Sequence, residues 1–198
     1  MKKKILLVGL LVVLVAAVSV GLTVAFLTSQ SSVTNTFTVG DVAITLDEAK
    51  VDANGDPVTP AERVTANTYK LIPGHSYTKD PQIHVGAASE DCYLFVKVED
   101  GLAAIEADQT IAAQMAANGW KTVPGVSNVY VYATGSDAKT IVSKGANISV
   151  FDSFKLTGDA NTAAYENAQI VVTAYAIQAD GFANSTPEVI WSTAGFAN

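Results

Sequence analysis

Apolar and polar residues alternate in short runs along most of the chain after residue 40, and this pattern predicts an all-β domain. The two strongest extended segments are residues 92–99 and residues 169–178. The second is the longest and is apolar on both faces in its middle, as expected of a central strand. Weaker extended segments, separated by Gly, Pro, Asn and Asp turns, are predicted at residues 42–46, 69–71, 81–85, 120–123, 129–133 and 147–151.

Two segments break the alternation and favour helices. Residues 102–118 are rich in alanine, with Ile111 and Met115 four positions apart, and a following Asn-Gly pair supplies a helix stop. A short C-terminal helix is expected to start at Pro187, because proline suits a first helical turn. About nine or ten short strands with one inserted helix and this short C-terminal helix favour a jelly-roll-like, two-sheet β-sandwich in a single domain.

The N-terminus has the pattern of a secretion signal. Three lysines follow the first methionine and precede 23 uncharged residues, 5–27. The small Ala25 suits a signal peptidase, so we expect cleavage between Ala25 and Phe26, with residues 1–25 as the signal peptide. At about 1.5 Å per helical residue the apolar run could also cross a bilayer, which leaves an uncleaved anchor as the alternative.

The mature chain, residues 26–198, begins with an extended segment at residues 26–39. Most of its apolar residues share one parity, whereas threonines occupy the other. The parity slips at Gly40, which indicates a bulge or a bend between two strands. Residues 26–39 therefore have few apolar groups to hold them in their own domain. The odd-numbered apolar residues are Leu27, Val33, Phe37 and Val39.

The charge of the chain argues against one class of partner, and its cysteine content excludes one kind of covalent stabilisation. The net charge is −7, and removal of the three N-terminal lysines leaves nine basic against 19 acidic residues, a net charge of −10 for the mature chain. This acidity argues against a nucleic-acid partner, because phosphates require a basic face. The single cysteine, Cys92, excludes an intrachain disulfide. We expect it to be a small buried residue at the start of a strand, with an intermolecular disulfide as the alternative.

The candidate metal sites are incomplete. Residues 52–56 resemble the start of a calcium loop, but proline and arginine stand where that pattern needs glycine and glutamate, so an Asn-Gly turn is expected. A zinc peptidase usually needs two histidines one helical turn apart with a glutamate base. His75 and His84 are nine positions apart and are expected to be exposed polar residues; Asp80 is a carboxylate that could join them.

The sequence also lacks the motifs of other enzyme classes. It contains no G-x-S-x-G motif, no phosphate-binding loop and no dinucleotide fingerprint. Trp120, Trp191 and the pair Tyr130 and Tyr132 could form a carbohydrate platform, but packing in the core and at sheet edges is the expected use of these rings. We therefore expect no enzyme activity, no cofactor and no metal.

Four segments that follow the lysine-rich start extend over nearly the whole chain. They are TVAFLTSQSSVTNTFTVGDVAITLDE (23–48), YKLIPGHSYTKDPQIHV (69–85), EDCYLFVKVE (90–99) and AYAIQADGF (174–182). Together with that start they resemble the TasA/camelysin family, secreted Gram-positive bacterial proteins whose signal peptide is read by the dedicated signal peptidase SipW.

The resemblance implies a jelly-roll domain that is secreted to the extracellular biofilm matrix or the cell surface. In TasA-like members the freed N-terminus of one subunit completes the sheet of the next, and the matching positions here are residues 26–39. The implied partners are copies of the chain itself, a SipW-type signal peptidase and other matrix proteins, with membrane contact only through an uncleaved signal segment. Because some relatives carry a metallopeptidase label, a secreted metal-dependent peptidase is an alternative, as is a surface adhesin that does not polymerise.

Overall fold

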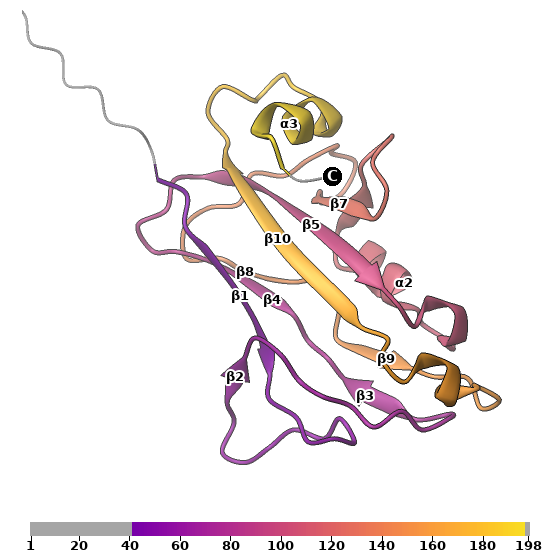
Figure 1. Ribbon diagram of the computed structural model, residues 1–198. Coiled ribbons are helices and arrows are strands. Elements are labelled where there is room, and N and C mark those ends of the chain that lie inside the picture. The colour runs from indigo at the N-terminus through magenta and orange to yellow at the C-terminus, as the bar shows by residue number, and fades with distance from the viewer. Residues whose placement is uncertain (1–40, 197–198) are drawn as a thin grey trace, which may run out of the picture. The chain divides into compact units, whose positions relative to one another are not determined.

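The computed structural model describes residues 41–196, whereas residues 1–40 and 197–198 lie outside that description. The described chain is mainly antiparallel strands, which confirms the all-β prediction (Figure 1). The strands are β1 (Ile44–Ala49), β2 (Arg63–Val64), β3 (Ser76–Thr78), β4 (Gln82–Val85), β5 (Cys92–Asp100), β6 (Trp120–Thr122), β7 (Val129–Tyr132), β8 (Asn147–Ser149), β9 (Ser153–Lys155) and β10 (Ile170–Gln178). One sheet has the order β2-β1-β4-β8, a second has the order β10-β5-β7-β6, and β3 pairs with β9.

Both four-stranded sheets contribute to one main core. Leu94 and Val96 of β5 and Ile83 of β4 are fully buried in it. The intervening residues of β5, Tyr93 and Phe95, point to the other face of their sheet and belong to a second core. The sequence of β5 is continuously apolar because both of its faces are buried.

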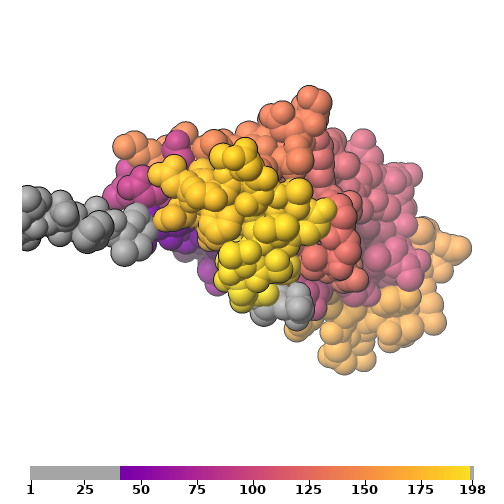
Figure 2. All heavy atoms as spheres, turned by 90° about the horizontal axis from the view of Figure 1, so that it is seen from above, coloured from indigo at the N-terminus to yellow at the C-terminus, as the bar shows by residue number. Residues whose placement is uncertain are grey.

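The predicted C-terminal helix is confirmed as α3 (Pro187–Ala194), which covers the outer face of the second sheet. Trp191 of this helix is 2% exposed, and its ring centroid lies 5.8 Å from that of Phe95 and 5.0 Å from that of Tyr175. Figure 2 shows the residues of α3 and its surroundings, in yellow, gathered on one side of the molecule. The predicted packing role of the tryptophans is therefore confirmed, since Trp120 is also buried.

The inserted helix is shorter than predicted. A 3-10 turn, η1, spans Ala103–Ile105, and α2 spans only Ile111–Ala117. Between them Glu106 is extended and Asp108 has a φ of 57°, so the backbone leaves the right-handed helical region. Thr110 is the N-cap of α2, because its side-chain oxygen accepts a hydrogen bond from a backbone N–H of the first turn at 3.2 Å. A second 3-10 turn, η2, spans Thr162–Tyr165.

Two smaller predictions are confirmed. Residues 52–56 form a turn, in which Asp52 Oδ1 accepts two backbone N–H groups and Gly55 adopts a φ of 83°. Cys92 is fully buried at the first position of β5, and this burial, with the nearby charge of Asp91, raises the pKa of its thiol to about 11. None of the helices between residues 41 and 196 is long and apolar enough to cross a membrane.

The largest departure from the sequence prediction concerns β10. It pairs with β5 along its whole length, from Ile170 opposite Asp100 to Gln178 opposite Cys92. Within residues 41–196, however, no strand pairs with its other side. In this described part of the chain β10 is therefore an edge strand, although its sequence pattern is that of a central one.

Candidate functional site

A groove of about 720 Å³ lies between β1 and β10. Leu46 and Glu48 form part of its wall on β1, and Ile170 and Val172 form part of its wall on β10. The loop that contains residues 65–71 closes another side, although residues 69–71 were predicted to be a strand. That loop is held in part by the Tyr69 hydroxyl, which donates to a carbonyl of β3 at 3.1 Å.

The strands on either side of this groove expose apolar groups that pack against the main core, and on β10 these groups continue past the groove itself. Ala174 and Ala176 of β10 are only half-buried, whereas their partners on β5, Val96 and Leu94, are fully buried. On β1 the contrast is the same, because half-buried Leu46 lies opposite fully buried Ile83. The core-facing surface is therefore incompletely covered at Leu46 beside the groove and at Ala174 and Ala176 further along β10.

Among the described residues, no strand pairs with the backbone of β10 on the side of this groove. Gly101 N donates to Gln169 O at 2.8 Å, and Ala179 N donates to Asp91 O at 2.8 Å. Because pairing alternates along an antiparallel strand, odd-numbered residues of β10 direct their N–H and C=O groups to β5. Even-numbered residues, Ala174 among them, direct these groups to the open edge. The groove thus offers backbone hydrogen bonds beside apolar side chains, as a sheet does when it lacks a strand.

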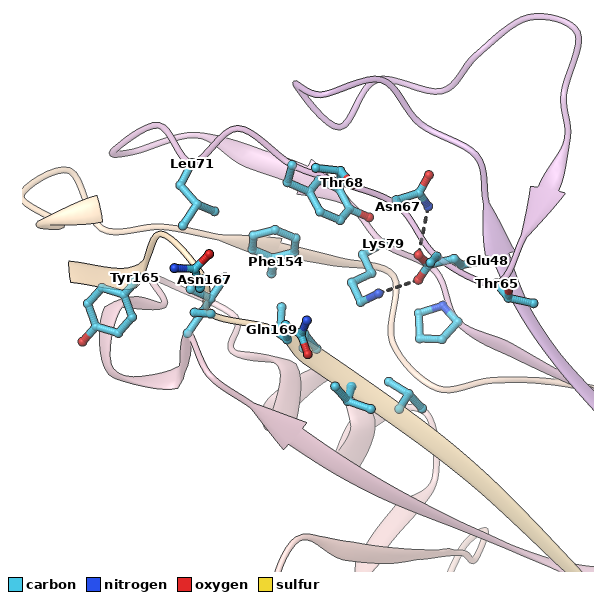
Figure 3. A pocket seen from close by; sticks show the side chains of 18 of the residues that line it. Glu48, Thr65, Asn67, Thr68, Leu71, Lys79, Phe154, Tyr165, Asn167 and Gln169 are labelled. Carbon is cyan, nitrogen blue, oxygen red and sulfur yellow. Dashed lines mark hydrogen bonds and ion pairs between the residues drawn. The ribbon is translucent and has the colours of Figure 1, made fainter. Parts of the chain in front are cut away.

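A buried ion pair lines part of the groove (Figure 3). Lys79 Nζ donates to Glu48 Oε2 at 2.5 Å, and Asn67 Nδ2 donates to Glu48 Oε1 at 2.9 Å. The side chains of Lys79 and Glu48 are only 10% and 7% exposed. This pair was not predicted from the sequence, although Glu48 shares the even parity of Leu46 and therefore belongs to the core-facing side of β1.

The opposite face of β1 carries a polar network that joins all four strands of the first sheet. Arg63 Nε donates to Asp47 Oδ1 at 2.5 Å, and Arg63 Nη1 donates to Asp80 Oδ2 at 3.0 Å. His84 Nε2 lies 2.9 Å from Asp47 Oδ1, and His84 Nδ1 lies 2.6 Å from Asn147 Oδ1. These contacts hold β1 in place on the face opposite to the one that carries Leu46 and Glu48.

The predicted exposure of the two histidines is wrong, because both are half-buried and hydrogen-bonded. His75 Nε2 lies 2.8 Å from the carbonyl oxygen of Asn54, and its ring packs 4.6 Å from that of Tyr77, between centroids. Asp80, the carboxylate considered as a third metal ligand, is paired with Arg63. Among residues 41–196 no group of three or more His, Cys, Asp or Glu side chains is placed to hold a metal ion.

The His84 contacts predict a pH-dependent contribution to stability. The hydrogen bonds of His84 with Asp47 and Asn147 raise its pKa, because both ring nitrogens face oxygens that accept from the charged ring. This contribution is complete below the unfolded pKa of about 6.5 and is lost as the pH rises through the higher folded pKa. At Asp47 burial opposes the charge, but hydrogen bonds from His84 and Arg63 outweigh it and lower the pKa, so that contribution is lost only in acid.

Replacement of His84 by glutamine should therefore lower the free energy of unfolding more at about pH 5.5 than at about pH 8.5. Urea denaturation of the mature chain and the variant at both pH values measures this difference. An equal loss at the two pH values would show that the charged ring is not favoured in the folded state.

The predicted cleavage and strand-donating residues lie outside the described part of the chain. They are Ala25, Phe26, Leu27, Val33, Phe37 and Val39. The groove contains none of the other candidates for chemistry from the sequence: Trp120, Trp191, Cys92, His75 and His84.

Comparison of the chain with known protein families, with curated proteins and with solved structures found no match in any of the three.

Proposed function

We propose that the chain is a secreted structural subunit of extracellular biofilm-matrix or cell-surface fibres. In this proposal, residues 26–39 of one copy enter the groove beside β10 of the next copy and complete its sheet. The observation that carries the proposal is the open edge of β10, whose sequence is that of a central strand. The jelly-roll topology and the relation to the TasA/camelysin family are parts of the same proposal.

The composition of residues 26–39 suits this groove. The segment contains no charged residue, so its insertion buries no additional charge beside the ion pair of Glu48 and Lys79. It has 14 residues, and β10 has nine, so it is long enough to pair along the whole open edge. Strand addition of this kind combines main-chain hydrogen bonds with pockets for alternate side chains.

The direction of the first described residues favours the groove of another copy over the chain's own groove. Asp41 O accepts a hydrogen bond from Glu90 N at 3.0 Å, and Ala43 O accepts one from Gly86 N at 2.8 Å. Residues 41–43 therefore continue the line of β1 beside the loop that follows β4. To enter its own groove the chain must reverse immediately before Asp41, whereas donation to another copy needs no reversal.

Signal-peptide removal would control assembly in this account. Cleavage between Ala25 and Phe26 separates the strand-donating segment from the apolar run that precedes it. The uncleaved chain keeps that segment attached to a stretch long enough to anchor in a bilayer. Assembly therefore follows export and cleavage.

Deletion of residues 26–34 from the mature chain should abolish fibres and leave a folded monomer, because it removes most of the donor strand but none of the described domain. Electron microscopy detects fibres, and thermal denaturation shows whether the truncated chain still unfolds cooperatively, as a folded monomer does. Fibres that survive the deletion contradict strand donation by this segment.

A further inference from the structure

The groove combines an apolar wall with a buried ion pair, so its occupant needs apolar and polar groups on one face. Ile170 and Val172 line the β10 side, and Glu48 with Lys79 lies on the side of β1 (Figure 3). An ammonium group carries three hydrogen-bond donors, and Glu48 is the acceptor that Lys79 Nζ reaches within residues 41–196. Donor capacity of Lys79 therefore remains for a group that enters the groove.

An uncharged amide is the side chain that fits this pair best. Its oxygen accepts from the ammonium group, and its NH₂ group donates to the carboxylate. A carboxylate or an ammonium group on the occupant would leave an excess buried charge instead. Asn67 already makes one of these two hydrogen bonds, since its Nδ2 donates to Glu48 Oε1.

Residues 26–40 contain two amides, Gln30 and Asn35. In an extended strand Asn35 lies on the same face as Val33 and Phe37, whereas Gln30 lies on the opposite face. Asn35 thus has an apolar neighbour on each side along that face. The serines of the same parity lack this arrangement, because each has another serine as a neighbour.

Resting on the proposed function, we propose that Asn35 of the entering strand meets the Glu48–Lys79 pair of the receiving copy and sets the register of insertion. Val33 and Phe37 then cover the apolar groups on either side. A shift by one residue would turn these apolar side chains away from the core. A shift by two would place an apolar side chain against the ion pair.

A synthetic peptide of residues 26–40, with a solubilising lysine tail, tests this register by competing with fibre growth of the mature chain. The peptide with Asn35→Leu should need a concentration about tenfold higher, or more, for half-inhibition, because it loses hydrogen bonds to charged groups. The matched control is Gln30→Leu, which removes the other amide and should change the half-inhibiting concentration by less than about twofold.

The receiving side provides the reciprocal test. Glu48→Leu and Lys79→Met are combined, because removal of one charge leaves the other buried and unpaired. Asn35→Leu is added to the same chain so that its own segment matches the apolar groove. With this chain, the Asn35→Leu peptide should compete at least as well as the unchanged peptide.

The outcomes separate the two proposals. Failure of the unchanged peptide to inhibit growth contradicts strand donation itself. Inhibition by the unchanged and the Asn35→Leu peptides at equal concentrations leaves strand donation intact and overturns the register. If the receiving-side variant does not fold, the comparison of the Asn35→Leu and Gln30→Leu peptides on the unaltered chain still tests whether Asn35 sets the register.

Discussion

Replacement of Ala174 by proline is expected to stop fibre growth while the subunit remains folded. The N–H group of Ala174 points to the open edge of β10, because the odd-numbered residues of this strand pair with β5. Proline lacks this N–H group and is tolerated on edge strands whose N–H side faces solvent. The variant therefore cannot accept a strand at this position, although its own residues 26–39 are unchanged.

The adjacent residue supplies the matched control. Thr173 directs its N–H group to β5, so Thr173→Pro removes a ladder hydrogen bond within the subunit and should destabilise it by roughly 1–3 kcal/mol. Electron microscopy and urea denaturation of both variants separate the two effects. Fibres formed by the Ala174→Pro variant at the wild-type rate would falsify the assignment of β10 as the receiving edge.

Replacement of Trp191 by alanine should cause a large loss of stability, about 3–5 kcal/mol. The indole is 2% exposed, and its ring centroid lies 5.8 Å from that of Phe95, 5.0 Å from that of Tyr175 and 5.2 Å from that of Phe196. Alanine removes most of these contacts and leaves a cavity between α3 and the second sheet. Because Tyr175 belongs to β10, the same variant should also loosen the receiving edge.

Val189 on the same helix is the control, because its side chain is 50% exposed. Val189→Ala should change the free energy of unfolding by no more than about 0.5 kcal/mol. Urea denaturation of the two variants measures the contrast. A loss below about 1 kcal/mol for Trp191→Ala would show that α3 contributes little to the second core.

Local sequence patterns predicted individual elements well. The segment at 92–99 matches β5 to within one residue, because its apolar pattern is local and uninterrupted. Pro187 marked the start of α3 for a similarly local reason. The helix predicted over 102–118 was too long, because an alanine-rich pattern does not reveal the positive φ of Asp108, which separates η1 from α2.

The position of β10 in its sheet could not be predicted in this way. An apolar pattern shows that both faces of a strand are suited to burial, but it does not show how many strands pair with its edges. That number depends on pairing with β5, which is distant in the sequence. In our account the pattern of β10 is suited to the fibre, in which a strand from another copy covers the edge.

The candidate groove was beyond sequence prediction for the same reason. Its walls come from β1, the loop with residues 65–71, Lys79 and β10, which are distant from one another in the chain. Only the even parity of Glu48, shared with Leu46, indicated that a charged side chain lies on the core-facing side of β1. The segment proposed to donate a strand, residues 26–39, was predicted from local properties, namely its alternation and its lack of charge.

A mixture of two variants, each blocked on one side, tests strand donation between copies most directly. The mature chain that lacks residues 26–34 keeps the receiving groove, whereas the Ala174→Pro variant keeps the donor strand. Each should be monomeric alone, and together they should form a one-to-one complex that grows no further, as measured by size-exclusion chromatography with light scattering. Two separate monomers in the mixture, or fibres from either variant alone, would contradict donation of residues 26–39 to the edge of β10.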